Sequence, residues 1–222
     1  MQFVRWIIVW AGLGLLVPGL VGCDRSTSES WYPYVLAFGG GEPGWPVWGD
    51  TIRFDLVMTL SGGGSLQGGY GDPPTPIALM NMGSLPVPGS IQLEWFSHRT
   101  ETLYQVDAQM PEDFPQRVKA WMKKYPVKRY HHSLLVGYSA HGEASLWWRI
   151  SCKRCPEERR RLDKQVIPIV RALKAQPVAK ERESDHCKQV HAYVRQGVFQ
   201  YHPQSLCLKL ALQQANSQYP GY

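Results

Sequence analysis

The stretch "IQLEWFSHRTETLYQVDAQM" at residues 91–110 contains two runs in which apolar and polar side chains alternate. Leu93 and Trp95 belong to the first run, and Leu103 begins the second. Between the runs, "SHRTE" at 97–101 is polar. Alternation with a period of two over short segments is typical of half-buried strands. The stretch therefore predicts a β-hairpin, and with it an antiparallel sheet.

A second hairpin and an intervening helix follow. "HSLLVGYSAHGEASLWWRI" (132–150) alternates on both sides of a predicted turn at His141. Between the hairpins, "EDFPQRVKAWMKKY" (112–125) has a helical period, and Asp113 and Gln116 suggest a capping-box-like start. Its apolar residues share one helical face: Phe114, Val118, Trp121 and Met122.

The sequence before the first hairpin predicts strands and loops. Residues 31–38 are aromatic and favour a strand, and the Gly/Pro-containing residues 39–50 favour a loop. Residues 51–60 alternate cleanly and predict one half-buried strand. Residues 61–90 contain eight Gly and five Pro. A stretch of this length without regular structure is usually functional or disordered.

The C-terminal third predicts helices. Residues 162–173 place their apolar side chains on one helical face, with a kink expected at Pro168. Residues 184–197 have a Ser or Asp cap and end at Gly197, which favours a helix that terminates there. Residues 205–215 alternate like a strand but are rich in helix-forming residues, so we favour helix.

The N-terminus has the pattern of an export signal. Arg5 precedes an apolar core at 7–20, which is too short to span a bilayer. "LVGC" at the end of this core matches the lipobox of bacterial lipoproteins, so we expect residues 1–22 to be removed and Cys23 to be acylated. An uncleaved anchor and an ordinary secreted chain are the alternatives.

The remaining sequence predicts a short tether and one folded domain. Residues 23–30 are polar after the cysteine, and residues 31–222 suit a single periplasmic domain anchored to the cell envelope by the N-terminal lipid. The chain has 24 Lys+Arg against 18 Asp+Glu, a mild excess without the basic stripe of a nucleic-acid-binding protein. We expect no nucleic-acid partner. The excess suits an anionic lipid surface, an acidic protein or simple solvation.

Four cysteines remain beyond Cys23. They are Cys152, Cys155, Cys187 and Cys207. In an oxidising compartment an even number predicts two disulfides, and we favour pairing each of the first two with one of the last two. A zinc site that also uses His191 is the alternative. The fold class expected is α+β: an antiparallel sheet of hairpins with a short central helix and C-terminal helices cross-linked to it.

The candidate catalytic residues do not form a known motif. Ser97 and His98 are neighbours on a strand and so point to opposite faces, while His131, His132 and His141 lie in or beside the second hairpin. No nucleophile elbow, phosphate-binding loop, zinc-protease motif or paired-carboxylate motif is present. The sequence therefore favours a binding protein with no cofactor and no metal over an enzyme.

The two hairpins resemble a family of bacterial lipoproteins that is known only as a domain of unknown function. The positions that carry the resemblance are Trp95, Ser97, Tyr104, Pro111, Gly137, Gly142 and Trp147. The resemblance covers roughly residues 31–148. Some members of that family look like immunity proteins against phospholipase-like effectors of the type VI secretion system.

The resemblance implies a function without catalysis. The protein would be held in the periplasm and would bind and neutralise a secreted antibacterial effector. Two loops are the expected contacts: residues 61–90, and the first hairpin turn with His98, Arg99 and Glu101. Of the neighbours Trp147 and Trp148, a regular strand exposes one. A structural or assembly lipoprotein of the envelope, without a toxin partner, is the alternative function.

Overall fold

The structure, a computed structural model, describes residues 31–156, 164–178, 183–197 and 207–208. The expected signal peptide, Cys23 and the tether lie outside these residues. The elements are β1 (Trp31–Tyr32), β2 (Val35–Gly40), β3 (Val47–Phe54), β4 (Met58–Leu66), β5 (Ala78–Met80), β6 (Leu85–Pro86), β7 (Ser90–Ser97), β8 (Thr102–Gln109), α1 (Phe114–Lys124), β9 (Tyr130–Tyr138), β10 (Glu143–Cys152), β11 (Gln165–Lys174), β12 (Gln176–Pro177) and α3 (Glu183–Arg195).

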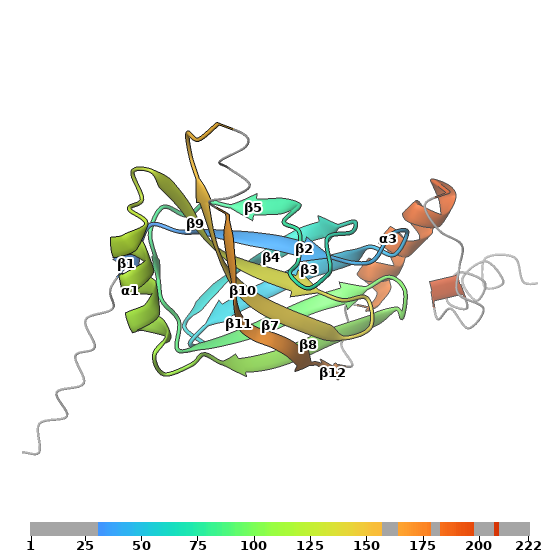
Figure 1. The fold of residues 1–222 in the computed structure, drawn as a ribbon. Helices are drawn as coiled ribbons and strands as arrows, with labels where there is room; N and C mark the ends of the chain where they lie inside the picture. Colours follow the sequence, from blue (N-terminus) through green and yellow to red (C-terminus); the bar gives the residue numbers. More distant parts are fainter. Residues whose placement is uncertain (1–30, 157–163, 179–182, 198–206, 209–222) are drawn as a thin grey trace, which may run out of the picture.

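Most strands belong to two five-stranded sheets that face each other (Figure 1). The β9 sheet has the strand order β11-β10-β9-β2-β5, and the β7 sheet has the order β12-β8-β7-β3-β4. Among the described strands of the two sheets, β2 and β9 are the one pair that is parallel. β1 and β6 form a separate antiparallel ribbon. The fold is mainly β, with less helix than the α+β class expected from the sequence.

The two sheets are connected at two places. On one side the chain runs from β11 in the β9 sheet into β12, which pairs with β8 of the β7 sheet. On the other side the Gly40 amide at the end of β2 donates to the carbonyl of Gly68, 3.0 Å away, just after β4. Helix α1 lies across one end (Figure 1). A space closed in this way can exclude water from its centre.

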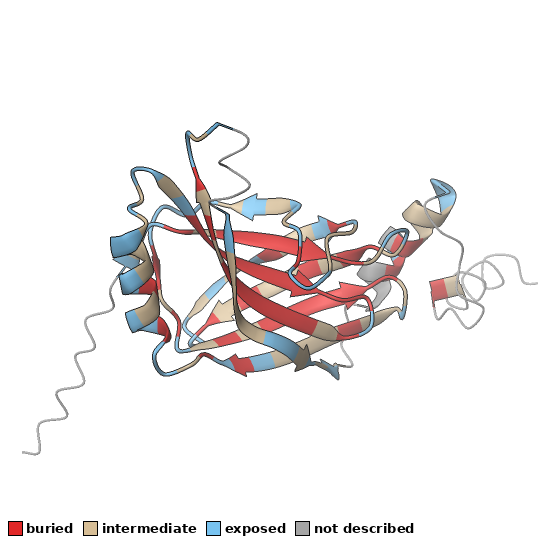
Figure 2. Ribbon diagram, viewed as in Figure 1, coloured by how far each residue is buried: buried red, intermediate tan, exposed pale blue. Residues whose placement is uncertain are grey.

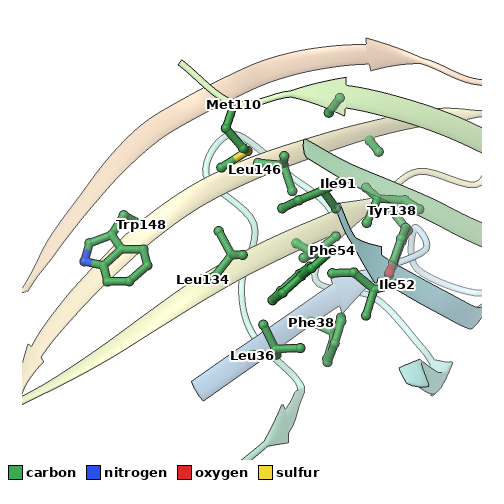
Figure 3. Close-up of a cluster of buried hydrophobic side chains, with 14 of the residues drawn as sticks. Leu36, Phe38, Ile52, Phe54, Ile91, Met110, Leu134, Tyr138, Leu146 and Trp148 are labelled. Carbon is green, nitrogen blue, oxygen red and sulfur yellow. The ribbon is translucent and has the colours of Figure 1, made fainter. Parts of the chain in front are cut away.

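Buried apolar side chains from both sheets fill this space (Figure 3), and Phe114 and Val118 of α1 belong to the same core. Figure 2 shows the buried positions along the facing strands. Trp148 of β10 lies at the centre of an aromatic cluster at the α1 end, with ring centroids 5.9 Å from Phe114 and 5.8 Å from Trp121. Trp95 of β7 packs against Tyr138 of β9 at 5.3 Å. Large rings that bridge the sheets bury much apolar area, so they dominate the stability of the fold.

Both predicted hairpins are confirmed, because β7 pairs with β8 and β9 pairs with β10 in antiparallel register. The predicted helix is also confirmed, with Phe114 and Val118 buried on its inner face. The predicted cap is wrong: the Asp113 side chain makes no capping hydrogen bond and lies 3.8 Å from the Arg117 guanidinium. Pro115, which has no amide hydrogen to satisfy, occupies the first turn instead.

The region at 51–90 contains more strand than the sequence predicted. The expected single strand at 51–60 is a hairpin, since β3 ends at Phe54 and β4 returns from Met58. Asp55 and Leu56 have φ angles of 50° and 58°, which turn the chain within two residues. Residues 61–90 include the end of β4 and all of β5 and β6, so they are not an irregular excursion. The expected loop at 39–50 is limited to residues 41–46.

The predicted helix at 162–173 is wrong where the structure describes it, because Gln165–Lys174 form strand β11. Val166, Ile167 and Val170 are β-branched and favour a strand. Pro168, expected to kink a helix, lies opposite Trp147 in an edge strand, where a missing amide hydrogen is tolerated. The helical period of this segment therefore did not decide its structure.

Trp147 and Trp148 point to opposite faces of β10, yet both are buried, with 4% and 0% exposure. Trp148 faces the core. Trp147 packs on the other face of the β9 sheet with Leu135 and Ala37, and the Arg171 guanidinium carbon lies 5.5 Å from its ring centroid. The expected exposure of one tryptophan is wrong, because this outer face is covered as well.

Candidate partner-binding site

Three connections meet at the end of the molecule opposite α1. They are the β2–β3 loop (41–46), the β7–β8 turn (98–101) and the β9–β10 turn (139–142). Strand register brings them together, since Val47 pairs with Ser97 and Gly40 pairs with Tyr138. We call this three-loop surface the loop end. The sequence indicates the β7–β8 turn as a candidate contact, but only strand register brings the other two connections beside it.

Hydrogen bonds tie the three connections into one unit. The Ser97 hydroxyl donates to the Ala140 carbonyl at 2.7 Å, which links the β7–β8 turn to the β9–β10 turn. The His98 amide and Nδ1 both donate to the Pro46 carbonyl, at 3.3 and 3.1 Å. The Glu42 carboxylate accepts from the Ala140 amide at 3.3 Å. Each loop is therefore held by the other two.

Two further hydrogen bonds connect this unit to the strands beside it. The Trp95 indole N–H donates to the Ser139 carbonyl at 2.9 Å. The Tyr70 hydroxyl donates to Glu143 at 3.3 Å, at the start of β10. Burial, together with the neighbouring Glu143 carboxylate, raises the pKa of Tyr70 to about 12, so this hydroxyl keeps its proton at neutral pH.

The predicted contact residues differ in their surroundings. Arg99 is half-buried, and its guanidinium carbon lies 5.3 Å from the ring centroid of Trp45. Glu101 has a φ of 50°, and its carboxylate accepts from the Cys207 amide at 2.8 Å. His98 is 1% exposed and lies between the rings of Phe96 and Tyr193, at 5.3 and 5.1 Å. Arg99 thus remains at the surface, while His98 packs inside.

The C-terminal helix packs beside this turn on the outer face of the β7 sheet. Helix α3 confirms the predicted helix at 184–197, and Gly197 follows it with a φ of 69°. Val190 and Cys187 are buried with Phe96 and Leu103. The hydroxyls of Tyr193 and Ser65 form a short hydrogen bond. Part of the polar β7–β8 turn is therefore packed against α3, and the sequence did not indicate this contact.

The two expected disulfides are present, but their expected pairing is wrong. Cys152 pairs with Cys155, and Cys187 pairs with Cys207. The first pair lies at the α1 end of β10, and the second lies with α3 near the β7–β8 turn, so the two pairs occupy different parts of the fold. Disulfides are typical of oxidising, extracytoplasmic compartments.

The two disulfides argue against the alternative zinc site. All four sulfur atoms are oxidised, whereas a zinc ligand must be a thiolate. The described part of the chain contains no grouping of three or more His, Cys, Asp or Glu side chains that could share a metal ion.

Removing the Cys187–Cys207 bridge is expected to destabilise the protein more than removing the other bridge. The two cysteines are 20 residues apart, and the chain-entropy model assigns about 3 kcal/mol to a loop of this length but only about 2 kcal/mol to the three-residue separation of Cys152 and Cys155. Denaturant unfolding of the two double Cys→Ala variants measures the difference. Equal losses, or non-reducing peptide maps with other linkages, would contradict this pairing.

The sequence-based catalytic candidates serve structural contacts. The Ser97 hydroxyl uses its proton on a backbone carbonyl and accepts from the Thr100 amide at 3.3 Å, while the His98 ring contacts Pro46. A serine–histidine pair needs a direct hydrogen bond between the two side chains. His141 is exposed on the β9–β10 turn, with its amide donating to the Ser139 hydroxyl.

His132 is fixed as a neutral ring within the aromatic core. Its Nε2 lies 2.7 Å from the Tyr125 carbonyl, and its Nδ1 lies 3.3 Å from the Trp148 indole nitrogen. A carbonyl only accepts and an indole only donates, so Nε2 carries the proton and Nδ1 accepts. Burial lowers the pKa of His132, despite the opposing hydrogen bond to Tyr125.

Acidification is expected to destabilise the domain through His132. Its folded-state pKa lies below the unfolded value of about 6.5, so the unfolded chain binds the proton first and stability falls as the pH drops below about 6.5. One such group contributes a slope of at most about 1.4 kcal/mol per pH unit. Urea unfolding between pH 5 and pH 8 should show a flatter profile for His132→Gln. Identical profiles for the parent and His132→Gln would refute the assignment.

Several positions that carry the family resemblance meet where the two hairpins touch. The Tyr104 ring lies 5.6 Å from Trp95, and its hydroxyl donates to Thr100 at 3.1 Å. Gly142 has a φ of 83°, and a Cβ there would lie 2.6 Å from the Tyr104 ring. These residues therefore set how one hairpin packs on the other, which is a structural role.

Comparisons with protein-family models, with curated proteins and with solved structures found no match. Within residues 31–156, 164–178, 183–197 and 207–208, no helix has both the length and the apolar composition required to cross a bilayer.

Proposed function

We propose that this protein is a lipid-anchored, periplasm-facing immunity protein that binds a secreted antibacterial effector and neutralises it by occlusion. The effector class suggested by the family resemblance is a phospholipase-like toxin delivered by a type VI secretion system. Two disulfides support export to an oxidising compartment. The lipobox that ends at Cys23 supports an anchor on the envelope.

The loop end is the observation that carries the binding role. Its three connections are held together by the Ser97–Ala140, His98–Pro46 and Glu42–Ala140 contacts. A surface that is already ordered loses little conformational entropy on association, and this favours tight binding. Trp and Arg are the residue types that most often dominate interface energies, and the loop end presents Trp45 with Arg99 over its ring.

The hydrogen bonds that the polar side chains make favour a binding role over a catalytic one. Ser97 and His98 each contact a backbone carbonyl rather than each other. His132 is held in the core by Tyr125 and Trp148. An inhibitor that acts by occupying its target needs affinity and shape, and it needs no group poised to transfer a proton.

The anchor is tested by replacing one atom. Cys23→Ser should prevent acylation and shift the protein from the membrane fraction to the soluble fraction or leave it uncleaved, because a hydroxyl does not substitute for the thiol in acylation. Metabolic labelling with a fatty-acid analogue reports the lipid directly, and Cys152→Ala is the matched control, which should label like the parent. Absence of label on the parental protein would refute the anchor.

The immunity role is tested by competition. Cells lacking the gene should be killed by kin that carry an active type VI apparatus, and restoring the gene should restore survival. Attackers with an inactive apparatus provide the control. Deleted cells that survive as well as their parents, together with no effector co-purifying with the tagged protein, would instead favour a structural envelope lipoprotein.

A further inference from the structure

The end of the molecule closed by α1, opposite the loop end, has an unusual surface. We call it the helix end. The described chain begins at this end with β1, and α1 crosses here between the sheets (Figure 1). The β3–β4 turn and the β5–β6 connection (81–84) lie at the same end. Register places the start of β9 and the end of β10 at this end too, since Tyr130 pairs with Cys152.

Exposed cations are concentrated at the helix end. They lie on α1, in the connection to β9 and after β10: Lys119, Lys123, Lys124, Lys128, Arg129, Lys153 and Arg154. The exposed carboxylates in the same described segments are fewer. Asp113 pairs with Arg117, Asp55 accepts from the Gly89 and Ser90 amides, and Glu112 precedes α1.

The positive charge at this end also affects the pKa of His131, at the start of β9. Partial burial lowers its pKa first, and the charges of Lys153 and Arg149 lower it further. Residues 157–163, "EERRRLD", contain three acidic and three basic side chains, so their formal charges cancel. The helix end therefore carries a positive field that suits an anionic surface.

Large apolar side chains are exposed at the same end. Trp31, Leu56, Val57 and Met82 are 52%, 71%, 85% and 53% exposed. Leu56 and Val57 form the tip of the β3–β4 turn, which is braced by the Asp55 carboxylate against the segment that leads into β7. Exposed apolar side chains beside a cationic surface are the composition of interfacial membrane contacts.

The backbone conformation of Leu56 is a second, independent observation that favours an external contact at this surface. Its φ of 58° lies in the left-handed region, where a residue with a Cβ is strained and where hairpin turns usually have Gly or Asn. A leucine that is both strained and 71% exposed contributes nothing to the core. Such outliers persist at sites that have a function, so the leucine is better explained by a contact outside the domain.

We infer that the helix end rests on an anionic bilayer, with Leu56 and Val57 at the headgroup level and the lysines of α1 over the phosphates. This inference builds on the proposed acylation of Cys23. Residues 23–30 span at most about 28 Å when extended, so the anchor holds Trp31 and the helix end near the lipid at high effective concentration. The loop end then faces away from the membrane, where it can meet a partner.

Hydrogen exchange of the full, acylated protein in vesicles tests this orientation. Vesicles of phosphatidylcholine with phosphatidylglycerol are compared with vesicles of phosphatidylcholine alone. Peptides covering Asp55–Met58 and α1 should exchange at least about fivefold more slowly on the anionic vesicles, because lipid contact suppresses local opening. Peptides covering the β7–β8 turn should exchange equally on both.

Matched variants separate lipid contact from general charge. The Lys119→Gln/Lys123→Gln double variant should lose this protection, whereas Lys174→Gln/Arg195→Gln, which removes the same charge from exposed sites elsewhere, should keep it. Leu56→Gly should lose protection at Asp55–Met58 without a lower Tm, because glycine adopts the left-handed conformation freely.

Equal exchange of the helix-end peptides on both vesicle types would overturn the inference, and so would protection that appears at the β7–β8 turn instead. Intact-mass measurement of the same sample reports acylation separately. An unacylated protein would refute the anchor, and its helix end would then be tested with excess anionic vesicles, where protection supports the inference and its absence refutes it. Loss of immunity with unchanged exchange would refute only the proposed function.

Discussion

Replacing Trp95 with alanine is expected to lower the free energy of unfolding by about 4 kcal/mol, the usual range for a fully buried aromatic side chain. Trp95 is 0% exposed, packs against Tyr138 and Tyr104, and donates to the Ser139 carbonyl. Alanine leaves a cavity between the sheets and an unpaired buried carbonyl, and both are destabilising.

Denaturant unfolding followed by circular dichroism measures this loss. Trp31→Ala is the matched control, because Trp31 is 52% exposed on the two-residue strand β1, and its loss should be below about 1 kcal/mol. A Trp95→Ala protein as stable as Trp31→Ala would mean that the core between the hairpins is not packed as described. A Trp95→Phe variant keeps most of the apolar volume and should fall between the two.

Alanine at Trp45 or Arg99 is expected to weaken effector binding by at least about 30-fold, since truncating an interface hot spot removes about 2 kcal/mol or more and each 1.4 kcal/mol is tenfold. The two side chains stack with 5.3 Å between guanidinium carbon and ring centroid, so their effects should not add fully in the double variant. Stability should change little, because both residues are only partly buried.

Isothermal titration with the purified effector measures the affinity, and survival under type VI attack measures the consequence. Lys123→Ala and Trp31→Ala remove the same kinds of side chain from the helix end and should bind like the parent. Arg99→Lys keeps the charge but loses the planar stack, so we expect an intermediate affinity. Parental affinity for both alanine variants would exclude the loop end as the contact surface.

The sequence predicted the parts of the fold that depend on local pattern. Strands β7 and β8 alternate with a polar turn between them, and Leu93 and Trp95 point inward as that pattern indicates. Leu103 is the exception, because it is buried with Phe96 on the outer face of the sheet under α3. Helix α1 was predictable for the same reason, because Phe114 and Val118 recur at helical spacing. Such signals arise within one segment, so they survive whatever that segment later packs against.

The failures occurred where a distant neighbour decides the outcome. Residues Gln165–Lys174 have a helical period, but they become a strand because the edge of β10 offers hydrogen bonds. One of the neighbours Trp147 and Trp148 was expected to be exposed, yet Trp147, which points to the outer face of the sheet, is buried as well. The disulfide pairing was missed because spacing along the chain says nothing about which cysteines meet in space.

The candidate site shows the same division between local sequence patterns and contacts between distant residues. The sequence by itself determined a polar turn with Arg99 beside aromatic residues, because residue type and turn position are local properties. Only the tertiary structure decided that Trp45 lies under Arg99, that Glu42 and Ser97 bind the same neighbour, Ala140, and that His98 is buried. Strand register across both sheets brings these loops to one end, and register depends on contacts between residues tens of positions apart.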